Sequence, residues 1–405
     1  MLIVIAFDNL HEFDYIFPMI PRLAEKTIGN LLLGFPIITI TGPRQSGKTT
    51  LARAIFHDRP YASLEDPDIR QAATDDPRSF LGRFPDGAVL DEVQRCPELL
   101  SYLQTIVDAD TRMGLFLLTG SQQFGLMSRI TQSLADRTGF LELLPFSTTE
   151  LAQAGRLKST VDEMLFTGGY PPIYDRRIPP RTWFGAYVTA YIERDVRQLL
   201  KVQELETFQR FVRLCAGRTG QLLNLSSLAT ECGITHNTAK AWISVLEASY
   251  IVFLLRPHHA NFNKRLVKTP KLYFYDSGLA AWLLGIQTSE QIETHPLRGN
   301  LFETFIISEL LKSRLNLGER PNLFFWRDSN GNEVDVIVEK GIQLQPIEIK
   351  SGRTINREFF AGLEKWCALA GKVVDSPTLI YGGDESYSQR EVSVVGWKDA
   401  GNVGS

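Results

Sequence analysis

Short apolar runs alternate with helical patterns along the first third of the chain. The run PIITIT at 36–41 is rich in β-branched residues and predicts a buried strand, and TTLARAIFHD, which follows the intervening loop, repeats apolar residues at helical spacing. The runs GAVLDEVQ at 87–94 and GLFLLTGSQQ at 114–123 predict two more strands. Because crossovers between parallel strands are right-handed, this alternation predicts a parallel sheet with helices on both faces.

Residues 223–257 show a different pattern. Two short helical stretches flank the turn CGIT, and YIVFLL then predicts a strand. Ser226 is expected to cap the first helix and Thr235 the second, since hydroxyl side chains satisfy free N–H groups at helix starts. The residues of the second helix expected to face inward are Trp242, Ile243 and Leu246.

Strict alternation marks the last third of the chain. In NEVDVIVEKG, one face is predicted to carry Val334, Val336 and Val338, and the other Glu333, Asp335 and Ile337. In QPIEIKSG, Ile347 and Ile349 alternate with Glu348 and Lys350. A glycine-containing turn separates the two runs, which predicts a hairpin that brings Asp335, Glu348 and Lys350 together. Upstream, GNLFETFIISELLKSRL predicts a helix in which Glu303 is half-buried and needs a partner or a metal.

The loop ITGPRQSGKTTL at 40–51 carries the clearest chemistry. Its glycines lie between a predicted strand and a helix start, the context in which backbone N–H groups cradle phosphate. Lys48 is expected to reach the terminal phosphates of ATP, and Thr49 to hold Mg²⁺. The loop residues expected to bind ATP are Gly42, Pro43, Arg44, Gln45, Ser46, Gly47, Lys48, Thr49 and Thr50.

Acidic and polar residues end the next two predicted strands. Asp91 is expected to bind the Mg²⁺ that accompanies ATP, and Glu92 to polarise the attacking water. Thr119, Ser121 and Gln122 follow the third run and could sense the γ-phosphate. Because any strand can end in polar residues, this last assignment has an ordinary structural alternative.

The order of these motifs resembles the AAA+ ATPases. ITGPRQSGKTTL, VLDEVQRCPELLSYLQTIVD, LLTGSQQF and SLADRTGFLELLPFSTTEL are similar to a branch of prokaryotic ATPases that pair an AAA-type domain with an uncharacterised C-terminal region. The resemblance runs from about Pro21 to about Gly382. It implies a helical lid after the sheet, a homo-oligomer, and an arginine that acts on a neighbouring subunit. Arg137 matches that arginine, and Arg129 is the nearby alternative.

Residues 223–257 resemble a winged helix-turn-helix. The start of its second helix would offer His236, Asn237 and Lys240 to DNA. Winged helices also serve as packing modules between domains. Because the second helix offers only one clear cation, Lys240, that alternative stays open. The stretch NKRLVKTPK adds a local basic patch or a solvated loop, with Lys264, Arg265, Lys268 and Lys271 as its cations.

The late carboxylates resemble the PD-(D/E)xK nuclease fold. A helix glutamate, a strand aspartate and a Glu-x-Lys pair occur in that order, as Glu303, Asp335, Glu348 and Lys350. The resemblance implies that the acids bind Mg²⁺ and that the lysine positions a water, with Glu333 as a further candidate acid. The alternative is a solvated strand face on which Glu348 and Lys350 form an ordinary ion pair.

Composition narrows the classes of function. The chain of 405 residues has 44% hydrophobic residues and a net charge of −3, so any surface for nucleic acid must be local. Its four cysteines and six histidines lack the spacing of metal ligands, which indicates reduced thiols in a cytoplasmic protein. No apolar run reaches the roughly 18 residues of a membrane span.

The sequence thus predicts an α/β protein built around a P-loop ATPase domain. The expected parts are an N-terminal extension (1–20), the AAA+ domain (21–150), a helical lid (151–215), a winged-helix module (216–290), a restriction-endonuclease-like domain (291–390) and a tail (391–405). The predicted function is an Mg²⁺-dependent ATPase whose nucleotide state controls DNA engagement. The alternative is an ATP-driven signalling switch whose C-terminal half binds another protein.

Overall fold

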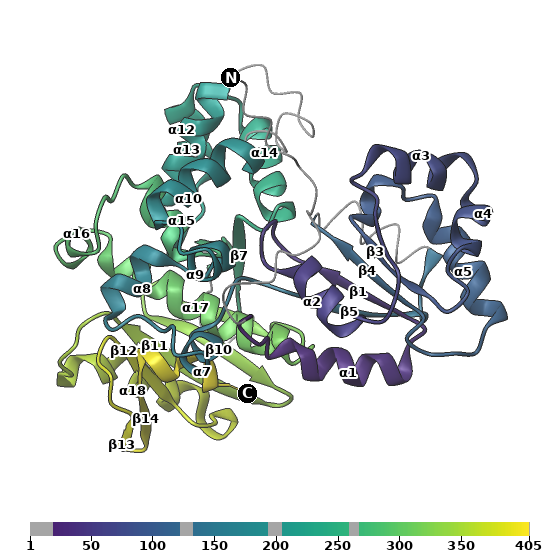
Figure 1. The fold of residues 1–405 in the computed structure, drawn as a ribbon. Coiled ribbons are helices and arrows are strands. Elements are labelled where there is room, and N and C mark those ends of the chain that lie inside the picture. Colours follow the sequence, from purple (N-terminus) through teal and green to yellow (C-terminus); the bar gives the residue numbers. More distant parts are fainter. Residues whose placement is uncertain (1–18, 122–132, 193–204, 259–266, 405) are drawn as a thin grey trace, which may run out of the picture.

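Five parallel strands form the first sheet of the computed structural model, in the order β2-β3-β4-β1-β5 (Figure 1). The structure describes residues 19–121, 133–192, 205–258 and 267–404. The strands are β1 (Ile37–Thr41), β2 (Tyr61–Ser63), β3 (Ala88–Asp91), β4 (Phe116–Gly120) and β5 (Thr138–Glu142). Within the described ranges no helix combines the length and the apolar character that crossing a membrane requires.

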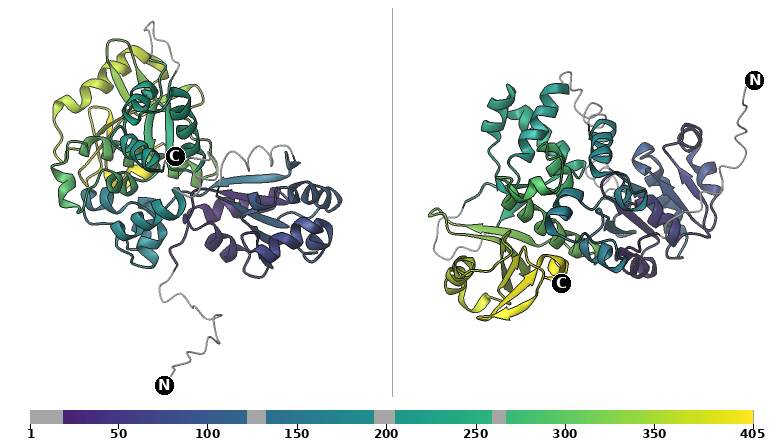
Figure 2. Two further views of the ribbon diagram at one scale, coloured as in Figure 1. Left: turned by 90° about the horizontal axis from the view of Figure 1, so that it is seen from above. Right: turned by 60° about the vertical axis from the view of Figure 1, so that its left-hand side comes forward.

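Helices cover both faces of this sheet, as the sequence predicts. Ile38 and Ile40 of β1 pack with the first two helices, whereas Ile37 packs with the next three, because successive strand residues point to opposite faces. The helices are α1 (Ala24–Gly34), α2 (Lys48–Ile55), α3 (Pro67–Asp75), α4 (Pro77–Gly82) and α5 (Leu99–Ala109). Together they form a lobe that lies beside the rest of the molecule in both views of Figure 2.

A mostly helical region follows the first sheet. Its helices are α7 (Thr148–Gln153), α8 (Val161–Thr167), α9 (Pro171–Asp175), α10 (Pro180–Tyr187), α12 (Leu205–Ala216), α13 (Leu225–Cys232), α14 (His236–Ala248), α15 (Ser277–Leu283) and α16 (Glu290–Glu293). Thr235 caps α14 as predicted, with its hydroxyl accepting from the Thr238 N–H. The predicted Ser226 cap is wrong, because Asn224 caps α13 and Ser226 lies inside the first turn.

The second sheet has nine strands in the order β13-β14-β12-β11-β10-β9-β7-β8-β6. These are β6 (Gln221–Leu222), β7 (Val252–Pro257), β8 (Lys271–Phe274), β9 (Leu323–Arg327), β10 (Glu333–Lys340), β11 (Gln343–Lys350), β12 (Thr378–Tyr381), β13 (Tyr387–Gln389) and β14 (Val392–Gly396). A short parallel pairing of β7 with β9 joins its two parts. The sheet is therefore continuous across the boundary expected near residue 290.

Two helices sandwich the C-terminal part of this sheet. The predicted helix at 299–315 is α17 (Arg298–Asn316), which packs on one face, and α18 (Ala361–Ala370) packs on the other through Trp366. The last residues were expected to form a tail outside this domain. That expectation is wrong, since β14 pairs with β12 and β13 and Trp397 is buried after it.

The predicted hairpin of β10 and β11 is confirmed, but the strict alternation of β10 is not. Its register against β9 shifts between Val334 and Ile337. Because a bulge inserts an extra residue, Val334 and Ile337 share the face that contacts Trp366, while Val336 and Val338 face α17. The assignment of Val334 to the face of Val336 is therefore wrong, whereas Ile337 lies on the face opposite Val336, as predicted.

Candidate nucleotide site and carboxylate cluster

The glycine-rich loop connects β1 to α2, in the strand–loop–helix context that the sequence predicts. Gly42 has a φ of +148°, and a Cβ there would lie 2.2 Å from the carbonyl oxygen of Leu143. Gly47 caps α2 with a φ of +93°. Both positions require the conformational freedom of glycine, which lets residues 42–47 turn tightly at the helix start.

The loop carries a buried hydroxyl that fits a polar ligand. The Ser46 Oγ is buried and has no hydrogen-bond partner among the described residues. A buried polar atom that lacks a protein partner is costly, and a phosphate oxygen of a nucleotide would satisfy it. Of the other predicted loop residues, Pro43 is buried, Arg44, Thr49 and Thr50 are half-buried, and Gln45 is exposed.

Lys48 is folded back onto its own loop. Its ammonium group donates to the carbonyl oxygens of Gly42, at 3.1 Å, and Pro43, at 2.7 Å. Burial lowers the pKa of Lys48 to about 8, although the nearby carboxylates Glu92 and Asp91 act in the opposite direction. The lysine thus lies on the loop in a buried environment, where an anionic ligand would stabilise its protonated form.

Asp91 lies at the carboxyl end of β3 and collects three hydroxyl donors. Thr49 donates to both carboxylate oxygens at 3.1 Å, and Tyr61 donates at 2.8 Å. Thr119 at the end of β4 makes the third bond. Thr49 and Asp91, the two predicted Mg²⁺ ligands, are therefore in direct contact, and their hard oxygens suit that ion.

Glu92 adopts a left-handed backbone conformation with a φ of +58°. Its carboxylate accepts a hydrogen bond from Ser121 at 3.0 Å and another from Gln94, and Gln94 also contacts Ser121 at 3.2 Å. Ser121 thus lies against the predicted catalytic acid, at the edge where β3 and β4 end. Gln122 falls outside the described residues.

Arg137 lies at the opposite edge of the sheet. It immediately precedes β5, beside the start of β1, whereas the phosphate loop follows the end of β1. Its guanidinium makes a two-pronged ion pair with Asp108 of its own chain, and that pairing lowers the pKa of Asp108. Arg137 is therefore remote from its own phosphate loop, and the alternative Arg129 lies outside the described residues.

Two buried side chains contact the phosphate loop and its strand from outside. Arg22 donates to the carbonyl oxygen of Ser46 at 2.8 Å and pairs with Glu150 at 3.0 Å. Tyr250 donates to the hydroxyl of Thr41, the last residue of β1, at 3.0 Å. Tyr250 lies between α14 and β7, so this bond links the helical region directly to the nucleotide site.

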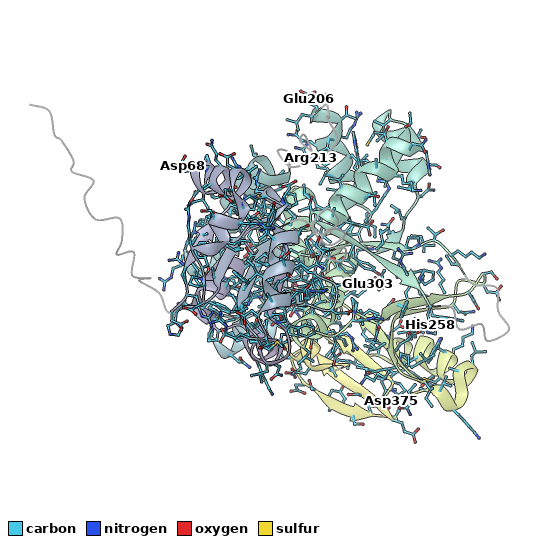
Figure 3. The ribbon with its side chains drawn as sticks, turned by 90° about the vertical axis from the view of Figure 1, so that its right-hand side faces the viewer. Asp68, Glu206, Arg213, His258, Glu303 and Asp375 are labelled. Atoms are coloured by element: carbon cyan, nitrogen blue, oxygen red, sulfur yellow. The ribbon has the colours of Figure 1, made fainter. Side chains whose placement is uncertain are left out.

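Four acids form what we term the carboxylate cluster: Glu303, Glu333, Asp335 and Glu348. Figure 3 shows Glu303 inside the molecule, where the helical and C-terminal regions meet. Burial, followed by the charge of Asp335, raises the pKa of Glu303 to about 7 and that of Glu348 to about 8. The Oδ2 of Asp335 accepts from the backbone N–H of Ile349 at 2.8 Å.

Two lysines neutralise this cluster. Lys350 lies 2.5 Å from Glu348 and 4.0 Å from Asp335. Lys271 pairs with Glu333 and lies 3.0 Å from Glu303. Burial acts to lower the pKa of Lys271, but the charges of Glu303, Asp335 and Glu333 outweigh it and raise that pKa. The prediction that Lys271 belongs to a surface patch or a solvated loop is wrong, because the side chain is buried in β8.

The cluster as folded does not fit a divalent metal ion. Within the described ranges, no three Asp, Glu, His or Cys side chains are arranged to hold one. One buried oxygen, Oε2 of Glu348, has no partner there, and Gly362 leaves open the space beside it. The remaining acids are already engaged by lysine and tyrosine donors, so the predicted ligand set of Glu303, Asp335 and Glu348 stays a prediction.

Several contacts have no clear signal in the sequence. Three hydrogen bonds join residues that are distant along the chain: Tyr61 to Asp91, Tyr250 to Thr41, and Arg22 to the phosphate loop. Gln94 is different, since it belongs to the acidic run GAVLDEVQ. The alternation of Lys271 and Tyr273 within KLYF could have indicated that both point to one face of a strand.

Family models match most of the chain. An AAA domain matches residues 34–152, and two domains of unknown function, DUF8612 and DUF4143, match residues 158–290 and 298–399. Two curated relatives, the uncharacterized proteins Rv2008c of Mycobacterium tuberculosis and Mb2031c of Mycobacterium bovis, are each 31% identical over 337 residues, which is 82% of this chain and 74% of theirs. The chain belongs to this AAA-domain family.

Solved structures are more distant from this AAA-family chain. A Walker-type ATPase of Pyrococcus abyssi is 14% identical, with 64% of this chain and 94% of that chain covered, at a TM-score of 0.42. The RuvB Holliday junction branch migration motor of Thermotoga maritima is 18% identical, with coverages of 57% and 88%, at a TM-score of 0.29. The AAA model and the parallel sheet together make residues 34–152 a P-loop ATPase domain; these structural likenesses are too low to add an argument.

Proposed function

We propose that this protein is an Mg²⁺-dependent ATPase whose nucleotide state controls how its C-terminal half engages DNA. Lys48 would bind the terminal phosphates, and Glu92, held by Ser121 and Gln94, would accept a proton from the attacking water. Thr49 and Asp91 would hold Mg²⁺, which neutralises phosphate charge when it is bound. Each chain would supply Arg137 to a neighbour's site in a cytoplasmic homo-oligomer.

The observation that carries the proposal is the bond between Tyr250 and Thr41. Tyr250 follows α14 by two residues, and Thr41 immediately precedes Gly42 of the phosphate loop. A nucleotide that rearranges the loop would therefore alter a contact made by Tyr250, in the segment that directly follows the helix pair α13–α14. Coupling between the nucleotide site and the C-terminal half requires a contact whose free energy differs between the nucleotide states. The hydrogen bond between Tyr250 and Thr41 can play this role because it is buried and direct.

The helix pair is proposed to be the DNA-binding part of a winged-helix module spanning residues 216–290. The elements around it follow the order α12, β6, α13, α14, β7, β8, with β8 between β6 and β7 in the sheet. His236, Asn237 and Lys240 are exposed at the start of α14, and Lys268 is exposed before β8. Lys264 and Arg265 lie outside the described residues.

The C-terminal domain is proposed to be nuclease-like. In support, the helix residue Glu303, the strand residues Asp335 and Glu348, and Lys350 act on one another electrostatically across α17 and the β10–β11 hairpin. The remaining expected parts, an N-terminal extension before residue 21 and a lid at 151–215, belong to the same proposal.

DNA binding measured at graded salt concentrations tests the proposal. Neutralising a phosphate releases counterions, so affinity for duplex DNA should fall steeply with salt and should depend on whether ATP is present. Lys240→Gln should reduce the slope of log affinity against log salt by about one. Lys26→Gln, the same charge change at an exposed position on α1, is the matched control. If no salt-sensitive binding occurs in any nucleotide state, the signalling-switch alternative is favoured.

A further inference from the structure

Strand β8 inserts two side chains into the carboxylate cluster from the module that carries α13 and α14. Lys271 is only 3% exposed, and its ammonium lies 3.0 Å from Glu303 and in contact with Glu333. Tyr273, two residues further along the same strand, donates to the same Glu303 oxygen at 2.5 Å. Lysine is almost never buried to this extent without anionic partners, so the cluster and Lys271 depend on each other.

The lysine takes up the oxygens that a metal ion would need. Mg²⁺ and Mn²⁺ sites are built from carboxylate and other hard oxygens, and Mg²⁺ requires them at about 2.0–2.1 Å. Tyr273 and Lys271 both bond to one Glu303 oxygen, and Arg327 adds a second cation to Glu333 at 3.1 Å. The Oε2 of Glu348 is buried and has no hydrogen-bond partner among the described residues, but one available oxygen is not enough for a metal site.

We propose that Lys271 is a fixed counter-ion that closes the carboxylate cluster to divalent cations. The proposal rests on the nuclease-like character proposed for the C-terminal domain, and it names the residue that occupies that site in place of a metal ion. The acids are supplied by α17, β10 and β11, whereas the lysine is supplied by another part of the sheet.

The attachment of this module holds Lys271 at the cluster. Strand β7 pairs with β9 at Arg256–Phe324 and Pro257–Phe325, and the hydroxyls of Thr219 and Thr304 form a buried hydrogen bond that joins the module to α17. Strand β8 in turn pairs with β7, whose preceding residues include Tyr250. Strand β8, which carries Lys271, therefore contacts the acids directly. It is also connected, through β7 and Tyr250, to the end of β1, where the nucleotide loop begins.

Calorimetric titration with Mn²⁺, without nucleotide or DNA, tests the proposal on the full chain. Lys271→Met removes the charge and keeps most of the apolar side chain. It should bind Mn²⁺ at least tenfold more tightly than the wild type, which corresponds to about 1.4 kcal/mol. Lys268→Met, at an exposed position three residues earlier, should titrate like the wild type. Equal affinities in the wild type and Lys271→Met would overturn the proposal.

Two further variants identify the site and guard against misfolding. Adding Asp335→Asn and Glu348→Gln to Lys271→Met should abolish the gain, and a gain that persists would mean that the ion binds elsewhere and would refute the proposal. If Lys271→Met fails to fold because its acids repel one another, Lys271→Met with Glu333→Gln restores the charge balance and should show the same gain. Because no DNA is present, failure here is distinguishable from failure of DNA engagement.

Discussion

At the scale of single residues, the nucleotide site is marked by one buried lysine and one buried hydroxyl. Lys48 donates hydrogen bonds to the loop carbonyls of Gly42 and Pro43, and burial lowers its pKa to about 8. The Ser46 hydroxyl is buried without a partner among the described residues. Both features are those of a site that becomes electrostatically complete when a polyanion binds.

The lowered pKa of Lys48 predicts proton uptake when ATP binds. Part of the Lys48 population is neutral in the free protein at pH 8.5, and the negative phosphates should raise its pKa and protonate it. Calorimetry of ATP binding at pH 8.5, in buffers with different ionisation enthalpies, measures this uptake directly.

The same titration at pH 6.5 should show much less uptake by Lys48, since the lysine is already protonated there. A Glu92→Gln protein, which keeps Lys48, should still show the pH 8.5 uptake. Lys48 would not be the phosphate ligand if binding at pH 8.5 were tight and released or absorbed no protons.

At the scale of elements, the loop depends on one close approach between backbones. A Cβ on Gly42 would lie 2.2 Å from the carbonyl oxygen of Leu143, which follows β5, so the loop and this strand end must move apart. Gly42→Ala should therefore lower the thermal midpoint and weaken ATP binding together.

Gly155→Ala is the matched control for that substitution. Gly155 also has a positive φ, of +63°, but a Cβ there would meet no atom within 4 Å. It should cost only the roughly 1 kcal/mol typical of left-handed backbone strain, and it should leave ATP binding unchanged. Equal losses of stability and of ATP binding in the two variants would contradict the role given to the Gly42–Leu143 contact.

The elements themselves were largely predictable, because most of their signals are local. A β-branched run predicted β1, apolar runs predicted β3 and β4, and the helical period of residues 223–257 predicted α13 and α14. The bulge in β10 was not predictable, since it depends on pairing with β9 rather than on the alternation of its own residues. Likewise Asn224 and Ser226 are both good cap residues, so the local sequence does not show which of them caps α13; in the structure it is Asn224.

Candidate site residues that belong to a contiguous motif could be predicted from the sequence. Contacts between residues that are distant along the chain could not. Residues 42–49 and 91–92 form contiguous patterns, and the structure places them together. Lys271 reads as one more cation in a basic stretch, and only the folded sheet reveals that it meets Glu303 and Glu333. Buried ion pairs of this kind are set by tertiary structure, which a linear pattern does not encode.

At the scale of the whole molecule, the position of Arg137 is compatible with the proposed action between subunits. The arginine lies at the edge of the sheet opposite its own phosphate loop, where it pairs with Asp108. An arginine that stabilises the transition state in a neighbour's site would have to exchange this exposed ion pair, which is weak, for the phosphates.

Mixing two inactive proteins tests this arrangement. Arg137→Ala and Lys48→Ala should each lose most ATP turnover, and the mixture should regain part of it, because some interfaces combine an intact loop with an intact arginine. Specific activity of the wild type should also rise with protein concentration. A mixture that stays as inactive as its components would leave Arg137 as a structural partner of Asp108.

The proposed coupling between the nucleotide site and the C-terminal half can be tested by a single comparison. Glu92→Gln should bind ATP without hydrolysing it, so its affinity for duplex DNA can be measured at fixed salt with and without ATP and Mg²⁺. We expect the two affinities to differ by about fivefold or more, and the ratio to approach one when Tyr250→Phe removes only the hydroxyl that bonds to Thr41. If the two affinities are equal in Glu92→Gln with ATP demonstrably bound, nucleotide state does not control DNA engagement, and the claim is wrong.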